Sequence, residues 1–155
     1  MRQLGSPNHG FAGDRGEADP DVRAALAAAG GEPDDYLRAV AALGGARLLL
    51  PIAPDADGDL SAVRTTSADG RTGLLVFTGQ DALLAWNPSA RPVPCTLDDV
   101  AATAVETGSA AIVVDLAGPA VLVIEATLVG ELAAGRRLVA LDGGGFGWLS
   151  RTSPA

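Results

Sequence analysis

The hydrophobic and polar residues of this chain repeat at two different spacings. Apolar residues three or four positions apart indicate helices, and each such stretch is bounded by a capping residue, a glycine or a proline. The helices predicted in this way cover residues 20–29, 33–43, 80–87, 97–107 and 128–132. Short apolar runs predict strands at residues 47–53, 60–66, 72–78, 110–116, 120–124 and 138–141.

Capping and turn residues define the ends of several of these elements. Asp19-Pro20 begins the first helix, because Asp accepts a hydrogen bond at the N-cap and Pro fits the first helical position. Thr96 is expected to cap the helix at 97–107, and Thr78, with Asp81 behind it, the helix at 80–87. Asp69-Gly70 predicts a tight turn that joins 60–66 and 72–78 as a hairpin.

The order of the elements predicts the α/β (α+β) class. Because the hairpin is antiparallel while helices are interspersed among the other strands, we expect a single domain with a mixed sheet of about five strands and helices packed on it. Residues 1–10 are expected to be a disordered tail, 11–149 the folded domain and 150–155 a C-terminal tail.

Composition and charge restrict the partners and the compartment. The chain has 155 residues and a net charge of −8, which argues against nucleic acid and anionic membranes as partners. The longest apolar region, 110–124, is interrupted by Asp115 and by Gly118-Pro119, so it predicts two strands rather than a membrane span. Cys95 is the only cysteine and residues 1–13 lack the apolar stretch of a signal peptide, so we expect a cytoplasmic protein.

An acidic loop is the one candidate for metal binding. Asp55, Asp57 and Asp59 have the spacing with which a calcium loop begins. Leu60 then stands where the loop needs a turn glycine, and Thr66 where it needs a bidentate Glu. We therefore predict no metal site.

The sequence contains no pattern typical of catalysis or of cofactor binding. His9 is the only histidine and lies in the predicted tail, so no Ser-His or Cys-His pair can be assigned. Cys95 is followed by Asp98 and Asp99, which disfavour a reactive thiolate, and we expect it to be a structural residue that tolerates replacement. The glycines of 143–147 do not match a dinucleotide fingerprint and predict a loop that packs its aromatic residues onto the body.

Four segments carry a family resemblance. They are FAGDRGEADPDVRAAL (11–26), ARLLLPI (46–52), LLVFTGQDALLAWNPSARPVP (74–94) and SAAIVVDLAGPAVLVI (109–124). Together they resemble the SseB-type N-terminal domain, the enhanced-serine-sensitivity family, in its actinobacterial form. The resemblance extends over residues 11–133, and it departs from the family pattern at Leu75, where a Pro is expected, and at Gly79, where a Ser-like cap is common.

The resemblance implies an α/β domain of undefined biochemical function, without catalytic residues that could be carried over. Our first hypothesis is therefore a non-catalytic binding or regulatory domain that recognises a protein partner. The alternative is a sensor for a small, amino-acid-like metabolite, and an enzyme is the third possibility. A sensor needs concave apolar walls with a few convergent polar groups, whereas a partner surface is flatter.

The leading segment of the domain is the predicted recognition surface. Phe11, Gly13 and Asp14 precede the first helix, and helix capping alone does not require them. We predict that this loop meets the body near Trp86 and Arg91, where Asp14 and Arg91 would supply complementary charges. The alternative is that Phe11 only packs the tail onto the core and that Asp14 is solvated.

Overall fold

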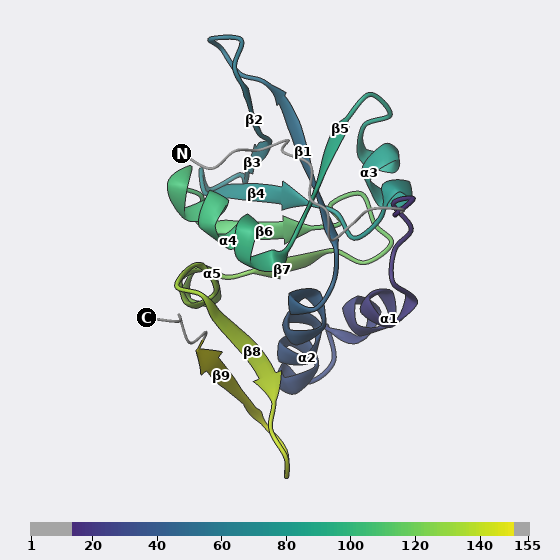
Figure 1. The fold of residues 1–155 in the computed structure, drawn as a ribbon, viewed down its shortest axis with the longest axis vertical. Helices are drawn as coiled ribbons and strands as arrows, with labels where there is room; N and C mark the ends of the chain where they lie inside the picture. The colour runs from purple at the N-terminus through teal and green to yellow at the C-terminus, as the bar shows by residue number, and fades with distance from the viewer. Residues whose placement is uncertain (1–13, 151–155) are drawn as a thin grey trace.

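The computed structural model describes residues 14–150, and these form five helices and nine strands in one α+β fold (Figure 1). The helices are α1 (Pro20–Ala28), α2 (Pro33–Gly44), α3 (Gln80–Trp86), α4 (Leu97–Glu106) and α5 (Ala126–Ala133). The strands are β1 (Leu48–Pro54), β2 (Leu60–Ala62), β3 (Arg64–Thr66), β4 (Thr72–Val76), β5 (Arg91–Cys95), β6 (Ala111–Val114), β7 (Leu122–Ile124), β8 (Arg136–Ala140) and β9 (Phe146–Ser150). The predicted fold class is confirmed.

The strands divide among three sheets rather than forming a single sheet of about five. Their orders are β2-β1-β5, β3-β4-β6-β7 and β8-β9, and only β4 and β6 run parallel. The first arm of the predicted hairpin is shared between two sheets, since β2 pairs with β1 and β3 pairs with β4. At Val63, between them, the N–H donates to Pro51 O (3.2 Å) while the carbonyl accepts from Leu75 N (3.0 Å).

The core lies between the four-stranded sheet and the helices. Leu74, Ile112 and Ile124 of that sheet are fully buried in one cluster with side chains of α2, α4 and α5. In Figure 1, α4 lies across β4 and β6, with α1 and α2 below them. On the opposite face, a smaller cluster joins Leu75 and Val113 to residues of β1 and α3. This second cluster covers only part of that face.

The helix starts confirm most of the capping predictions. The Asp19 side chain accepts from Asp21 N at the start of α1, and Thr96 forms a capping box at the start of α4. The prediction that Thr78 caps the helix at 80–87 is wrong, because Gly79 occupies the N-cap of that helix, α3. The Thr78 hydroxyl instead donates to the buried carboxylate of Asp115 at 2.6 Å.

Residues 136–150 form a hairpin, β8–β9, that extends at the lower end of the molecule (Figure 1). A single strand followed by a loop was expected here, but Gly143, Gly144 and Gly145 all have positive φ and turn the chain back into β9. Phe146 and Trp148 pack against the main core, as expected. None of the helices among residues 14–150 has the length and apolar content needed to cross a membrane.

Candidate functional site

The described part of the leading segment, residues 14–19, is held against the body by Arg47. The guanidinium Nε of Arg47 lies 2.5 Å from Asp14 Oδ2, and Nη2 donates to the carbonyl of Glu17. A third bond runs from Arg47 Nη1 to Thr78 O at 3.1 Å. Arg47 immediately precedes β1, so one side chain joins the leading segment to the end of β4.

The same segment also packs closely on the start of α3. The backbone N–H of Gln80 donates to Gly16 O at 2.7 Å. A Cβ added to Gly79 would lie 2.8 Å from the Cβ of Ala18, which is closer than carbon atoms approach. Glycine is therefore required at position 79, the place where the family pattern led us to expect a Ser-like cap.

A buried carboxylate lies beneath this contact. Asp115 follows β6, is fully buried and has a φ of +53°. Its two oxygens accept from the N–H (2.8 Å) and the hydroxyl (2.6 Å) of Thr78. Arg23 of α1 donates from Nε to the Thr78 hydroxyl at 2.8 Å and holds Asp81 of α3 with both of its terminal nitrogens. We call Arg23, Thr78, Asp81 and Asp115 the buried polar network after its two buried members, Thr78 and Asp115; the Asp81 side chain is largely exposed.

The electrostatics of the buried polar network follow from its burial and pairing. Burial raises the pKa of Asp115, although the hydrogen bonds from Thr78 and the charge of Arg23 oppose that rise. The hydrogen bond from Arg23 lowers the pKa of Asp81, and the same bond raises the pKa of Arg23. The polar groups of the network are bonded to one another, so the network joins α1 and α3 to the ends of β4 and β6.

An apolar groove lies on the part of the four-stranded sheet that the smaller cluster leaves open. Its volume is about 380 Å³. Thr65, Gly73, Ala111, Val113, Val121 and Val123 are among the residues that line it. Gly73 lies between Thr65 and Ala111 in the pairing register, and a Cβ there would come within 2.7 Å of Val113 Cγ2. Val113 thus packs directly over Gly73, which leaves no room for a side chain at that position. We call this surface the sheet-face groove.

Charged and edge residues border the sheet-face groove. Arg71 and Glu125 form an ion pair of 3.7 Å at its rim. Beside it, Tyr36 of α2 donates its hydroxyl to Val123 O (2.7 Å) and accepts from Glu125 N (3.3 Å). Tyr36 therefore occupies the outer edge of β7, while the face of the sheet stays accessible.

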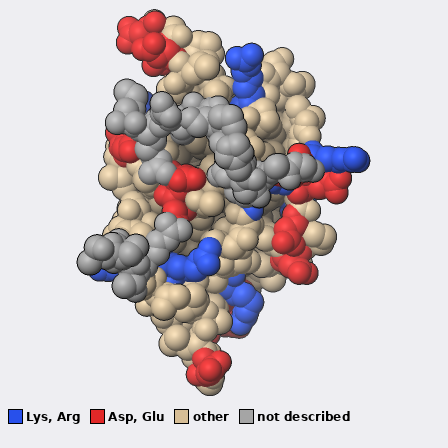
Figure 2. Space-filling view, in the orientation of Figure 1, with Lys and Arg blue, Asp and Glu red and all other residues tan. Residues whose placement is uncertain are grey.

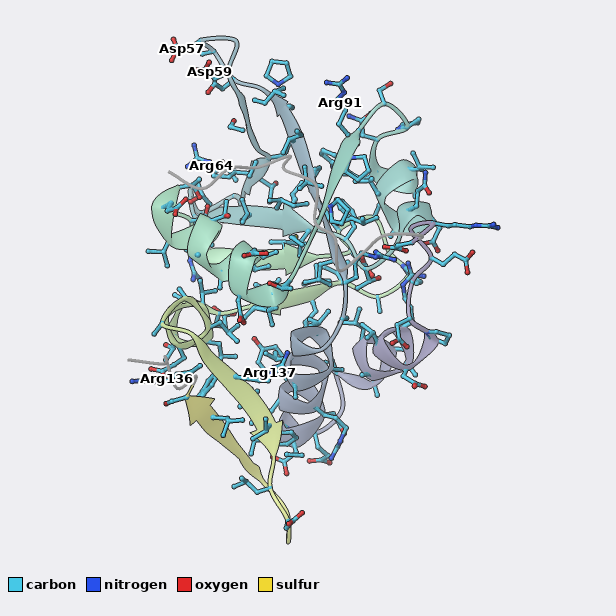
Figure 3. The ribbon with its side chains drawn as sticks, in the orientation of Figure 1. Asp57, Asp59, Arg64, Arg91, Arg136 and Arg137 are labelled. Carbon is cyan, nitrogen blue, oxygen red and sulfur yellow. The ribbon has the colours of Figure 1, made fainter. Side chains whose placement is uncertain are left out.

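The residues predicted from the sequence lie in different places. Phe11 and Gly13 are outside the described residues. Asp14 has Arg47 as its ion-pair partner instead of the expected Arg91. Arg91 is exposed at the start of β5 and lies toward the upper end of the molecule in Figure 3. Whether Asp14 and Arg91 take part in recognition stays a prediction.

Trp86 has a clear packing partner. Its ring lies 5.6 Å from that of Phe77, tilted by 33°, and it borders the smaller core cluster. Such a pair stabilises α3 on the sheet. Its predicted part in a recognition surface remains to be tested.

The acidic loop between β1 and β2 is organised by its own backbone. Asp55 Oδ1 accepts from the N–H groups of Asp57 (2.9 Å) and Asp59 (3.0 Å), and Figure 3 shows Asp57 and Asp59 at the loop tip. Within residues 14–150, no group of three or more His, Cys, Asp or Glu side chains could hold a metal ion.

On the face shown in Figure 2, Arg side chains are dispersed among acidic ones.

Comparison with known families identifies the domain. Residues 22–131 match the model of the SseB protein N-terminal domain. The chain belongs to this family. The resemblance to the SseB family found in the sequence is thereby confirmed. None of the curated proteins and none of the solved structures with which the chain was compared matches it.

The matched part of this SseB domain holds both features described above. It runs from α1 into α5 and so includes the buried polar network and the sheet-face groove, whereas the leading segment and the β8–β9 hairpin lie outside it. Sequence reasoning missed both features. Asp115 within an apolar run, and Gly73 inside a strand, were the available signals, since a buried charge needs partners and a strand glycine often marks a close approach.

Proposed function

We propose that this SseB domain is a non-catalytic binding module that recognises a protein partner through the sheet-face groove. The observation that carries the proposal is the open apolar surface beside β6 and β7. Leu116, Val121 and Val123 are exposed there at 38%, 50% and 40% of their surface. An apolar patch with a polar rim is typical of an interaction site.

The groove offers a partner both affinity and orientation. Burying one aliphatic side chain fully contributes roughly 1.5–3 kcal/mol, so covering these neighbouring residues contributes a useful part of a binding free energy. The charges of Arg71 and Glu125 at the rim would fix the direction of the bound segment and disfavour wrong partners.

The polar groups near the groove support binding rather than catalysis. The Ser67 hydroxyl donates to Asp69, and Arg71 is paired with Glu125. These groups satisfy one another and do not converge on a position where a reacting atom could be held.

A small, amino-acid-like metabolite is the second candidate. The groove volume of about 380 Å³ lies within the range of small-molecule sites, and Arg71 and Glu125 present both signs of charge. We favour a protein partner because the groove is open along the sheet face. We also propose a cytoplasmic location, since the only cysteine of the chain excludes an internal disulfide.

Site-specific photo-crosslinking in the native cell tests the proposal. A photoreactive residue at position 123 should give one dominant cross-linked protein. The control position is Val105 of α4, another exposed valine (57%), which should not give that product. If positions 105 and 123 give the same products, a protein partner at this groove is wrong. Native mass spectrometry of the purified domain then tests for a bound metabolite.

The variant Val123→Arg should weaken binding of the captured partner at least tenfold, because it places a charge on the apolar wall of the groove. Val105→Arg should leave binding unchanged. Both side chains are exposed, so each substitution should change the free energy of unfolding by no more than about 0.5 kcal/mol. Binding by calorimetry and unfolding in urea provide the two readouts.

A further inference from the structure

Two sheet edges in the described residues are blocked against further strand pairing. In β5, Pro92 and Pro94 alternate with the residues that bond β1, so the outer side of this strand lacks two N–H donors. In β7, the Tyr36 hydroxyl already bonds Val123 O and Glu125 N. Such devices prevent edge-to-edge association.

The remaining edges differ in length and in chemistry. β2 and β3 have only three residues each, which limits what they can pair with. β9 has five residues, Phe146–Ser150, with no proline and no charged side chain. Within residues 14–150 its only partner strand is β8, which itself packs against α2 and α5. Among the described strands, β9 therefore has the longest edge without a protecting device.

The pairing of β8 with β9 defines which groups face outward. Leu141 N–H donates to Gly145 O at 2.9 Å, and the register places Val139 opposite Gly147. Because hydrogen-bonding direction alternates along an antiparallel strand, Gly147 and Leu149 direct their backbone groups toward β8. Phe146, Trp148 and Ser150 direct theirs away from it.

This alternation makes the edge self-complementary. We propose that β9 is a self-association edge, on which a second copy of the chain adds its own β9 antiparallel about a two-fold axis at Trp148. Trp148 would then pair with Trp148, and Phe146 with Ser150 on either side. The three pairs supply about six backbone hydrogen bonds, two for each pair.

Side chains and charges fit the same arrangement. Leu149, exposed at 59%, would lie opposite Gly147 of the second copy, beside the exposed Leu141 side chain that packs over Gly147. The hairpin carries Arg137 and Arg136, the latter ion-paired with Glu131 of α5, at its base and Asp142 at its tip. Figure 3 shows the two arginines near the start of β8. An antiparallel two-fold axis brings the basic end of one hairpin toward the acidic end of the other.

Light scattering of the full chain over a range of concentrations tests this proposal. The wild-type chain should reach twice its monomer mass by about 200 µM. Ser150→Pro removes an outward N–H without affecting the bonds to β8, and it should raise the dimer Kd at least tenfold. Ser150→Ala is the matched control and should dimerise like the wild type.

A second variant covers the case in which proline disturbs the hairpin. Leu149→Glu places a carboxylate near its symmetry mate but opposite Arg137 of its own hairpin, so it should also raise the Kd while the hairpin stays folded. Val105→Glu is its control. A wild-type chain that stays monomeric at 200 µM, equal dimerisation by Ser150→Pro and Ser150→Ala, or a dimer lost in Val123→Arg instead, would each overturn the proposal.

Discussion

At the residue scale, Asp115 shows how one buried charge is tolerated. Its carboxylate has no exposure to solvent, accepts two hydrogen bonds from Thr78 and forms an ion pair of 3.5 Å with Nε of Arg23. Its positive φ is one that Asp and Asn adopt far more readily than other residues with a side chain. Aspartate at this position thus adopts the left-handed backbone conformation and also provides an acceptor for the buried N–H of Thr78.

Two replacements of Asp115, one that loses both roles and one that keeps both, should differ in stability. Asp115→Ala leaves the Thr78 N–H without its acceptor and puts alanine in a left-handed conformation, so we expect a loss of about 2–4 kcal/mol in the free energy of unfolding. Asp115→Asn keeps an acceptor and tolerates the conformation, and it should lose less. Urea unfolding measures both. Equal losses in the two variants would contradict this account.

The ion pair between Arg23 and Asp81 predicts a pH dependence. Arg23 holds the pKa of Asp81 below its ordinary value of 3.8. As the pH falls, the Asp81 carboxylate therefore takes up a proton in the unfolded chain before it does so in the native one. The stability contributed by Asp81 is complete above pH 3.8 and is lost as the pH falls through the lower native pKa. Asp115 acts in the opposite direction, because burial raises its pKa.

The variant Asp81→Asn should show this dependence against the wild type. At pH 7 it should be less stable by no more than about 1 kcal/mol, since the Asp81 side chain is largely exposed. The difference should shrink as the pH falls through the lowered native pKa of Asp81, because the wild-type carboxyl group is then protonated in both states. Urea unfolding at several pH values measures it. A difference that is the same at all pH values would assign the effect to something other than charge.

At the scale of elements, α5 contains a glycine that its packing does not require. Gly130 lies in the interior of α5 and a Cβ there would have no neighbour within 4 Å. Gly130→Ala should therefore stabilise the domain by roughly 0.5–1 kcal/mol, because alanine loses less backbone entropy in a helix. Chemical unfolding would show a higher midpoint with an unchanged slope. Gly79→Ala, where Ala18 fills the space, should have the opposite sign.

Other elements show where local patterns predict structure well. The helices were predicted from the spacing of their apolar residues and from their capping residues, and the turn at Asp69-Gly70 from its residue types. These signals act over a few neighbouring residues. The division of 60–66 at Val63 could not be predicted in this way. It depends on Pro51 and Leu75 lying on two sides of the same backbone unit.

At the scale of the whole molecule, the two proposed surfaces belong to different sheets. The sheet-face groove lies on β3-β4-β6-β7, and the self-association edge is β9. Substitutions at sites that share no partners act independently. Val123→Arg should therefore lose the partner and keep the dimer, while Ser150→Pro should lose the dimer and keep the partner. Loss of both properties in either variant would mean that the two surfaces are coupled.

Of the candidate site, the sequence identified part of the leading segment but not what that segment contacts. Asp14 was singled out as a charged residue before α1, yet its partner, Arg47, lies far along the chain. Thr78 was interpreted as a helix cap, because its neighbours in the sequence fit that role. Its actual partner, Asp115, is brought to it by the parallel pairing of β4 with β6.

The sequence alone determined the family, the fold class and most of the helices and strands, since these depend on residue type and on spacing within short stretches. Tertiary structure alone decided how the strands divide among three sheets, which charges pair, and which apolar face stays open. Those outcomes depend on contacts between residues distant in the chain, and a local pattern cannot specify them. The same apolar run is buried or exposed according to whether another element covers it.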